Sequence, residues 1–403
     1  MVDEATQWRG PLSGVRVLDL TRVLAGPAAS LAMADLGAEV IKVEAPGGGD
    51  ETRSFPPHKD GESHYFLSIN RGKKSIVVDL KSERGVALLK SLAKESDILL
   101  ENFRPGVMDN LGLGYRVLSE LNPKLIYCAI SGFGQTGPMR DQPSFDIVLQ
   151  ALSGAMSVNG DIGGQPLKMG IPLGDWVGGI NAPPAILSAL YERERTGKGR
   201  YIDVSLLDGM LNLLGYLSQL AFFNQSNPLP QGSQHPNLVP YGAFAAKDGT
   251  IIVACLTNQF WARICNALDM PQYIEDPRYD SLERRREARD EVNALINERT
   301  LVMSIAELTQ VFVEHRVPHA PILGVLEALN SEQARARNMV VNVDHSRLGE
   351  IPIVNRPIKF GDDHMHPPTA PPVLGEHSVE VLRSVLGFSD EQIDDLRKSQ
   401  VIN

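Results

Sequence analysis

The stretch "GVRVLDLTRVLAGPAASLAMADLGAEVIKVEAP", residues 14–46, decides the fold class of this chain. Its β-branched start at 14–21 is typical of a strand. Small residues and leucines at helical spacing follow over 25–37, with a turn where they begin and a glycine where they end. A second strand-like run occupies 38–46. Strand, helix and strand in this order form a βαβ unit, which implies parallel neighbouring strands.

The same alternation continues along the chain. Further strands are expected at 73–80, 97–103 and 124–134, with helices between them at 82–96 and 106–122. A long amphipathic helix is expected over 175–199, and a strand followed by an apolar helix over 200–223. This pattern predicts an α/β fold with a doubly wound, mostly parallel sheet. Such sheets bind their ligands at the carboxyl ends of the strands.

A change in composition marks a domain boundary at 224–240, where the chain is rich in proline, glutamine and serine. The pattern that follows at 241–256 is typical of a β-hairpin with its turn at Lys247-Asp248-Gly249. We expect four parts along the chain: the N-terminal part of a large domain over 1–200, a linker helix over 201–225, a small domain over 226–330, and a linker with a return to the large domain over 331–403.

Charge and cysteine content narrow the class of partner. The net charge of −10 over 403 residues argues against a general binder of nucleic acid or anionic membranes. Residues 1–14 lack the basic and apolar regions of a secretory signal, and no run reaches the roughly 18 apolar residues of a membrane span. Cys128, Cys255 and Cys265 have no metal-binding spacing. We therefore expect no metal, no nucleic-acid or membrane partner, and a reducing location: the cytoplasm, or the mitochondrial matrix in a eukaryote.

Several common catalytic motifs are absent from the sequence. The first βα turn, "TRVLAGP" at 21–27, is not the G-x-G-x-x-G of nicotinamide sites, and no Walker, G-x-S-x-G or H-E-x-x-H pattern occurs. Ser205 and Asp208 could belong to a catalytic triad. An apolar helix begins at this point, however, and residues of these types commonly cap helices. We therefore favour the capping role.

A single acid stands in the otherwise uncharged stretch "GIPLGDWVGG" at 170–179. Asp175 allows three interpretations: a helix N-cap, a buried structural acid, or a catalytic carboxylate. The neighbouring glycines would let a substrate approach the backbone closely, and free N–H groups there could stabilise an oxyanion. The local sequence favours a cap or a structural role and leaves catalysis open.

Eight stretches of the chain, in the right order, resemble the family III CoA-transferases, which include formyl-CoA transferase and the carnitine CoA-transferase. The α-methylacyl-CoA racemases are relatives of this family. The matching stretches lie at 11–53, 70–81, 101–115, 130–138, 145–154, 173–175, 196–209 and 374–377. The resemblance implies a Rossmann-like large domain, an inserted smaller α+β domain, and an interlocked homodimer.

The resemblance also implies a mechanism. The aspartate of "LGD", here Asp175, would attack an acyl-CoA thioester and form a mixed anhydride. The released CoA thiolate would convert that anhydride into an aspartyl-CoA thioester, from which the acceptor acid takes CoA. Coenzyme A, as its acyl thioester, is then both substrate and product, and no metal is needed. The pocket must also keep water away from the anhydride.

CoA contacts are carried over by position in the family's motifs. They are Val23, Ala25, Lys81, Asn102, Phe103 and Arg104. Because CoA is a polyanion, further phosphate partners are expected among Arg22, Arg71, Lys73 and Lys74, each of which could equally be a solvated surface charge. The chain departs from formyl-CoA transferase at Leu24 and Ala45, and it lacks that enzyme's glycine-rich loop. These departures argue against oxalate and formyl-CoA as substrates.

The stretch at 232–249 resembles members that use succinyl-CoA and a dicarboxylic acceptor. The expected acceptors are small dicarboxylates such as itaconate, mesaconate, citramalate or hydroxymethylglutarate. A second carboxylate requires a nearby cation, for which His235, Arg22 and Arg71 are candidates. Asp146 is expected to line the same site.

Two alternatives remain. A racemase would need a histidine where Phe145 stands, since it must move an α-proton. A non-catalytic CoA-binding subunit would be expected to lose the acid that Asp175 supplies. Both residues favour the transferase.

Overall fold

The computed structural model of the chain describes residues 10–361 and 366–403. Most of residues 1–14, in which the sequence shows no secretory signal, therefore lies outside the described residues. The chain divides into two compact units. The large unit contains the chain up to Ala155, then Lys168–Phe223 and Glu332–Asn403. The small unit contains Met156–Leu167 and Asn224–Ser331, so it also takes in twelve residues (156–167) that the sequence pattern assigned to the large domain.

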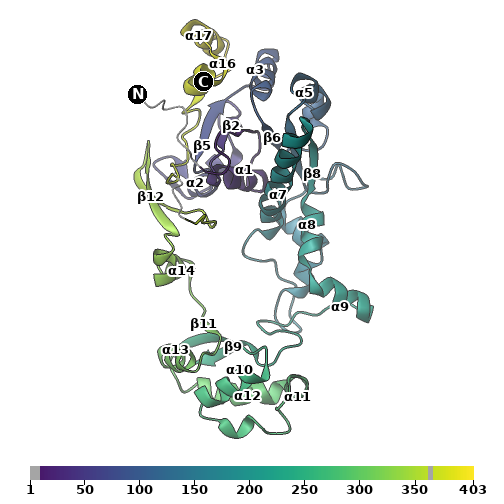
Figure 1. The fold of residues 1–403 in the computed structure, drawn as a ribbon, viewed down its shortest axis with the longest axis vertical. Helices are drawn as coiled ribbons and strands as arrows, with labels where there is room; N and C mark the ends of the chain where they lie inside the picture. The colour runs from purple at the N-terminus through teal and green to yellow at the C-terminus, as the bar shows by residue number, and fades with distance from the viewer. Residues whose placement is uncertain (1–9, 362–365) are drawn as a thin grey trace. The chain divides into compact units, whose positions relative to one another are not determined.

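A six-stranded parallel sheet forms the centre of the large unit (Figure 1). Its strands stand in the order β5-β2-β1-β6-β7-β8, so the direction of winding reverses between β1 and β6. The strands are β1 (Arg16–Asp19), β2 (Glu39–Glu44), β5 (Lys73–Val77), β6 (Ile98–Glu101), β7 (Ile126–Ser131) and β8 (Tyr201–Ser205). This confirms the predicted α/β class, and the reversal point is where such sheets bind ligands.

Helices cover both faces of this sheet, because alternate strand residues point to opposite sides. Leu18 and Leu99 belong to one buried cluster, whereas Val17 and Ile98 belong to the other. The first face is covered by α3 (Glu83–Lys94), α4 (Val107–Asn110), α5 (Tyr115–Leu121), α16 (Ser378–Leu386) and α17 (Asp390–Lys398). The second is covered by α1 (Ala25–Asp35), α6 (Asp146–Leu152), α7 (Leu173–Thr196) and α8 (Leu206–Leu213).

Smaller elements complete the large unit. They are β3 (His58–Lys59), β4 (Glu62–Ser63), α2 (His64–Ile69), α9 (Tyr216–Asn224, whose last residue lies past the unit's boundary), α15 (Glu332–Ala336) and the hairpin β12 (Val340–His345) with β13 (Gly349–Val354). Within the described residues no single helix is long and apolar enough to cross a membrane. The bent pair α8 and α9 passes that test only when the two are taken together, by length and composition.

Two expectations for the helices change. The segment 106–122 is two short helices and not one, because the Leu-Gly-Leu-Gly run between them turns the chain, with Gly112 at φ +66°. The long helix α7 begins at Leu173, before Asp175 and not after it. Ser205 does cap α8, since its hydroxyl accepts a hydrogen bond from the backbone N–H of Asp208.

The small unit is built on a three-stranded antiparallel sheet in the order β11-β10-β9. The predicted hairpin at its centre is confirmed: β9 (Tyr241–Ala246) and β10 (Gly249–Ala254) flank the turn at Lys247-Asp248. The third strand is β11 (His319–Pro321). The helices of the unit are α10 (Asn258–Ala267), α11 (Leu282–Glu287), α12 (Arg289–Thr300), α13 (Ile305–Glu314) and α14 (Val325–Leu329). Its own buried core contains Trp261 and Phe312.

The backbone of α7 comes directly against α1 at two glycines, Gly178 and Gly179. A Cβ atom on Gly179 would come within 2.6 Å of the Cβ of Ala28, and one on Gly178 within 3.2 Å of the Cβ of Ala25. Only glycine fits at so close an approach. The contact therefore holds the second turn of α7 beside the first turn of α1.

We expect Gly179→Val to lower the free energy of unfolding by about 1–3 kcal/mol, because α1 and α7 would have to move apart. Denaturant unfolding of the whole chain measures this. Ser188→Val, on the exposed side of the same helix, controls for placing a valine in α7 away from this contact. Equal losses in the two variants would contradict the packing argument.

Candidate active site

A cavity of about 400 Å³ opens at the carboxyl ends of β1, β6 and β7 in the large unit. Six segments contribute to its wall: the β1–α1 turn, the loop after β6, the end of β7, the segment before α6, the start of α7 and the start of α8. Its lining residues include Arg22, Val23, Leu24, Ala25, Asn102, Phe103, Arg104, Ser131, Arg140, Ser144, Phe145 and Asp175. The reversal of strand order between β1 and β6 places these segments together.

Asp175 reaches this cavity from the first turn of α7. Pro172 occupies the N-cap position, so the interpretation of Asp175 as a helix cap is wrong. Within the described part of the chain, the Asp175 carboxylate makes neither a hydrogen bond nor an ion pair. Burial raises its pKa to about 6, with a further contribution from the negative charge of Asp146. A carboxylate that borders a cavity without a partner is a candidate for chemistry.

Asp146 stands behind Asp175 and is not among the residues that line the cavity, contrary to the expectation from the sequence. Its Oδ1 accepts from the backbone N–H of Gly174 at 2.8 Å, and its Oδ2 accepts from the side chain of Gln150 at 2.8 Å. Gln150 is fully buried and also accepts from the backbone N–H of Met169 at 2.8 Å. Asp146 and Gln150 therefore fix the start of α7, which carries Asp175.

The turn between β1 and α1 supplies the opposite wall. Val23 has a φ of +63°, in the left-handed region, where a β-branched residue is strained by about 1–3 kcal/mol. Asn102 holds the preceding residue, because its amide accepts from the backbone N–H of Arg22 at 2.8 Å and donates to the Arg22 carbonyl at 2.9 Å. No side chain caps the first turn of α1, so the partial positive charge of this helix end faces the cavity at Ala25.

The loop after β6 forms the third wall. Glu101, at the end of the strand, is buried and accepts from the backbone N–H of Phe103 at 2.9 Å. Burial raises the pKa of Glu101 to about 7. The Arg22 guanidinium lies 4.8 Å above the ring of Phe103, and it also pairs with Glu51 at 3.2 Å.

A second cavity of about 310 Å³ adjoins the first, because Arg22 and Phe103 line both. Lys81 lies in this second cavity, as does Ala45, one of the two positions that depart from formyl-CoA transferase. The other departure, Leu24, lines the first cavity. Both departures therefore lie at cavity walls.

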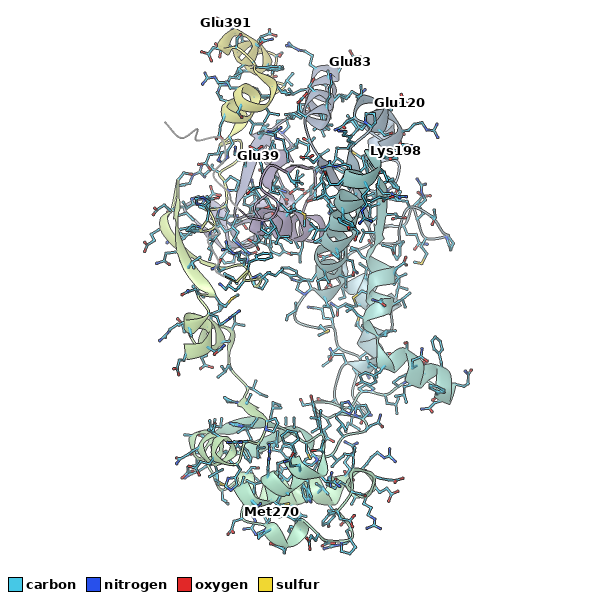
Figure 2. The ribbon with its side chains drawn as sticks, viewed as in Figure 1. Glu39, Glu83, Glu120, Lys198, Met270 and Glu391 are labelled. Atoms are coloured by element: carbon cyan, nitrogen blue, oxygen red, sulfur yellow. The ribbon has the colours of Figure 1, made fainter. Side chains whose placement is uncertain are left out.

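Several predicted phosphate partners are occupied by structural ion pairs. Lys73 is fully buried and lies 3.3 Å from Asp19, and Lys74 pairs with Glu39 and Glu380, both at 2.8 Å. Figure 2 labels Glu39 on β2. Arg71 pairs with Asp35 at 2.5 Å. None of the three lines the cavity that contains Asp175, so of that group only Arg22 does.

His235 belongs to the small unit. Its Nδ1 accepts from the backbone N–H groups of Asn237 and Leu238, at 3.0 and 3.1 Å. Partial burial, followed by the positive charge of Arg289, lowers its pKa, so the ring carries little positive charge at neutral pH. This environment does not support the expected role of His235 as a cation for a carboxylate.

Some cavity residues were not singled out from the sequence. Arg140 and Ser144 line the cavity from the segment before α6, and Ser131 does so from the end of β7. The Ser131 hydroxyl is buried and has no hydrogen-bond partner in the described part of the chain. The rule that ligands bind at the carboxyl ends of parallel strands could have identified Ser131. Among the described residues, no cluster of three or more His, Cys, Asp or Glu side chains could hold a metal ion.

Comparison with known proteins gives the same family as the sequence motifs. The sequence model of CoA-transferase family III matches residues 12–378. The chain is 37% identical over 394 residues to succinyl-CoA:glutarate CoA-transferase of Homo sapiens, covering 98% of this chain and 90% of that protein. It is 39% identical over 370 residues to acetyl-CoA:oxalate CoA-transferase of Acetobacter aceti, covering 91% and 94%. A crystal structure of a CAIB/BAIF family protein from Brucella suis superposes with a TM-score of 0.84 at 34% identity, covering 94% of this chain and all of that one.

The raised pKa of Asp175 makes a prediction that needs no substrate. The folded chain binds a proton on Asp175 more tightly than the unfolded chain between about pH 4 and pH 6, so this group costs stability above about pH 6. Asp175→Asn should therefore raise the free energy of unfolding by about 1–2 kcal/mol at pH 8 and change it little at pH 4. Thermal unfolding at both pH values measures this. The control Asp141→Asn, at an exposed acid, should leave the free energy of unfolding unchanged at both pH values. An equal gain for Asp175→Asn at pH 4 and pH 8 would contradict a raised pKa of Asp175.

Proposed function

The chain belongs to the family III CoA-transferases, and we propose that it moves CoA from succinyl-CoA to a small dicarboxylic acid through a thioester on Asp175. The single observation that carries this proposal is the Asp175 carboxylate, which borders the cavity without a partner and has its pKa raised to about 6. At neutral pH most of this group is ionised, and its basicity exceeds that of an ordinary aspartate. Both properties favour a carboxylate nucleophile.

The two adjoining cavities suit an elongated ligand such as CoA. In this proposal the thioester lies beside Asp175, and the nucleotide end extends past Arg22 and Phe103 toward Lys81. Val23, Ala25, Asn102, Phe103 and Arg104, which the family resemblance assigns to CoA, all line the first cavity. The cationic side chains and the end of α1 supply the positive charge that a polyanion requires.

The chemistry requires four acyl transfers. The Asp175 carboxylate attacks the succinyl thioester carbonyl, the C–S bond breaks, and CoA thiolate leaves a mixed anhydride. The thiolate then attacks the Asp175 carbonyl, which forms the aspartyl-CoA thioester and releases succinate. The acceptor carboxylate attacks this thioester and releases the thiolate again, and the thiolate finally attacks the acceptor's carbonyl. The product acyl-CoA forms and the Asp175 carboxylate is regenerated.

The acceptor is proposed to be a dicarboxylate because Arg140 lines the cavity in addition to Arg22 and Arg104, which this proposal assigns to CoA. A second carboxylate on the acceptor would pair with the Arg140 guanidinium. The two relatives named above act on glutarate and on oxalate according to their names, and both of these acids are dicarboxylic. We include glutarate with itaconate, mesaconate, citramalate and hydroxymethylglutarate as acceptors to be tested, with succinyl-CoA as donor.

The racemase alternative is less favoured by the cavity itself. Phe145 lines it with 74% of its surface exposed, and no histidine is found among the described lining residues. Without such a base an α-proton has no acceptor of suitable pKa on that side. The non-catalytic alternative would leave the position of Asp175 in the cavity without a purpose.

We also propose a homodimer in the cytoplasm, or in the matrix if the source is eukaryotic. Large apolar side chains lie exposed along α8 and α9: Leu211, Leu213, Tyr216, Phe222 and Phe223, the last with 84% of its surface exposed. Exposed apolar surface of this kind is typical of a protein interface, and a second copy of the chain would cover it. The three buried free thiols suit a reducing compartment.

Incubation with succinyl-CoA followed by borohydride should leave a reduced residue at Asp175, since a carboxylate becomes reducible only as an anhydride or thioester. Intact-protein and peptide mass spectrometry detect it. Asp175→Ala should show no modification, whereas Glu120→Ala, at an exposed acid that lines neither cavity, should behave as the unaltered chain does. If CoA binds and no acyl-CoA modifies Asp175, the covalent mechanism is wrong.

An acceptor panel tests the dicarboxylate assignment. Glutarate, mesaconate and itaconate should be used with a kcat/KM about tenfold to a hundredfold higher than butyrate, because a charged hydrogen bond to the second carboxylate is worth about 1.5–3 kcal/mol. Steady-state rates with succinyl-CoA as donor measure this. A preference for monocarboxylates over every dicarboxylate would overturn the assignment and leave the transferase activity standing.

A further inference from the structure

The turn between β1 and α1 is held at three consecutive backbone positions by side chains from elsewhere in the large unit. The Lys42 ammonium, on β2, donates to the carbonyl of Thr21 at 2.7 Å. Asn102 binds both backbone groups of Arg22. Asp50 accepts from the backbone N–H of Val23 at 3.2 Å. The conformation of the turn is therefore set by groups outside it.

Val23 depends most on these external hydrogen bonds, because its backbone conformation is strained. Among the described residues that have a positive φ and are not glycine, it is the only β-branched one. A β-branched residue leaves the left-handed region unless its surroundings hold it there. Such strain is commonly found where a ligand binds, and Val23 lines the cavity beside Leu24 and Ala25.

The group that holds Val23 is half of a buried ion pair. Asp50 lies 2.8 Å from the Lys42 ammonium, and the side chains of both are essentially inaccessible to water. The other oxygen of Asp50, which accepts from Val23, also accepts from the backbone N–H and the hydroxyl of Thr52 at 3.0 and 2.8 Å. Burial opposes the charge on Asp50, but Lys42 and Thr52 together hold its pKa below the ordinary value. Asp50 therefore accepts as a charged group, which makes a stronger hydrogen bond than a neutral one.

A buried ion pair is seldom kept for stability alone, since an apolar pair of similar volume often serves as well. Neither Lys42 nor Asp50 lines either of the two cavities. We propose that Lys42 and Asp50 are positioning residues for the acyl-CoA: their ion pair holds Val23 in its left-handed conformation and so preforms the wall against which the CoA arm binds. This inference rests on the proposed function in taking the cavity as the CoA site.

The proposal predicts a specific coupling between Asp50 and Val23. Asp50→Ala removes the acceptor, so Val23 should return to a negative φ and the wall should be correctly formed in only a fraction of molecules. If that fraction is about a tenth, the Kd for CoA rises about tenfold. In a Val23→Gly background the same Asp50→Ala change should cost about twofold or less, because glycine adopts a positive φ without a clamp. Calorimetric titration with free CoA measures all four proteins of the cycle.

A matched control separates positioning from stability. Glu39→Gln breaks the Arg16–Glu39 and Lys74–Glu39 pairs, which lie in the large unit and line neither cavity. Although burial opposes the charge on Glu39, the two cations hold its pKa below the ordinary value, so this variant should lower the melting temperature without changing the Kd for CoA. Equal effects of Asp50→Ala in both Val23 backgrounds would overturn the proposal. If Asp50→Ala does not fold, the double variant Lys42→Met with Asp50→Leu takes its place in the cycle, because an apolar pair of similar volume removes the acceptor without leaving a buried unpaired charge.

A crystal structure of the Asp50 variant gives a readout that is independent of CoA. Val23 is expected to leave the left-handed region, and a Val23 that keeps its positive φ would refute the clamp whatever CoA does. If the unaltered chain fails to bind CoA, the proposed function is wrong, and the conformation of Val23 still decides whether Asp50 holds the turn.

Discussion

The close contact between α1 and α7 is the constraint on which the site depends. Gly178 and Gly179 let the two helices touch, and Asp146 binds the backbone of Gly174 at the start of α7. Together they place Asp175 opposite the β1–α1 turn, in one cavity. The glycines around Asp175 are thus explained by helix packing and by the bond to Asp146. The explanation suggested by the sequence, that they admit a substrate to the backbone, is not needed.

Two kinds of buried acid occur around this site, and they differ in their partners. Asp19, Glu44 and Asp50 are matched by Lys73, Arg53 and Lys42, and although burial opposes their charge, these cations hold the pKa of each acid below its ordinary value. Asp175 and Glu101 have no cation beside them among the described residues, and burial raises the pKa of both. Glu101 accepts from the backbone N–H of Phe103, as the paired acids accept from groups around the cavity, whereas Asp175 borders the cavity without a hydrogen bond. The absence of both a cation and a hydrogen bond, and not the residue type, separates Asp175 from the other acids.

The sequence predicted the sheet well because each of its strands from 14 to 134 is a continuous local run of suitable residues. The predicted cavity residues of the β1–α1 turn and of the loop after β6 came from the family resemblance, and Ser131, Arg140 and Ser144 were missed. The sequence failed where the partner of a charge is distant in the chain. In the sequence Lys73 resembles a free cation, but in the fold it contacts Asp19, which is 54 residues away along the chain. Arg71 likewise contacts Asp35, which is 36 residues away. No periodicity encodes such pairs, so they require the folded structure.

The proposed reaction asks one carboxylate to be both nucleophile and leaving group, and the environment of Asp175 suits both roles. Nucleophilicity rises with pKa, whereas departure from an anhydride becomes harder, so a balance is reached when Asp175 is close in basicity to the substrate carboxylates. A cation bound to Asp175 would lower its pKa and weaken the attack. Full burial would raise the pKa further and leave the acid protonated at neutral pH. Partial burial, with Asp146 as a fixed negative neighbour, holds the pKa at about 6, where the carboxylate is ionised and still reactive.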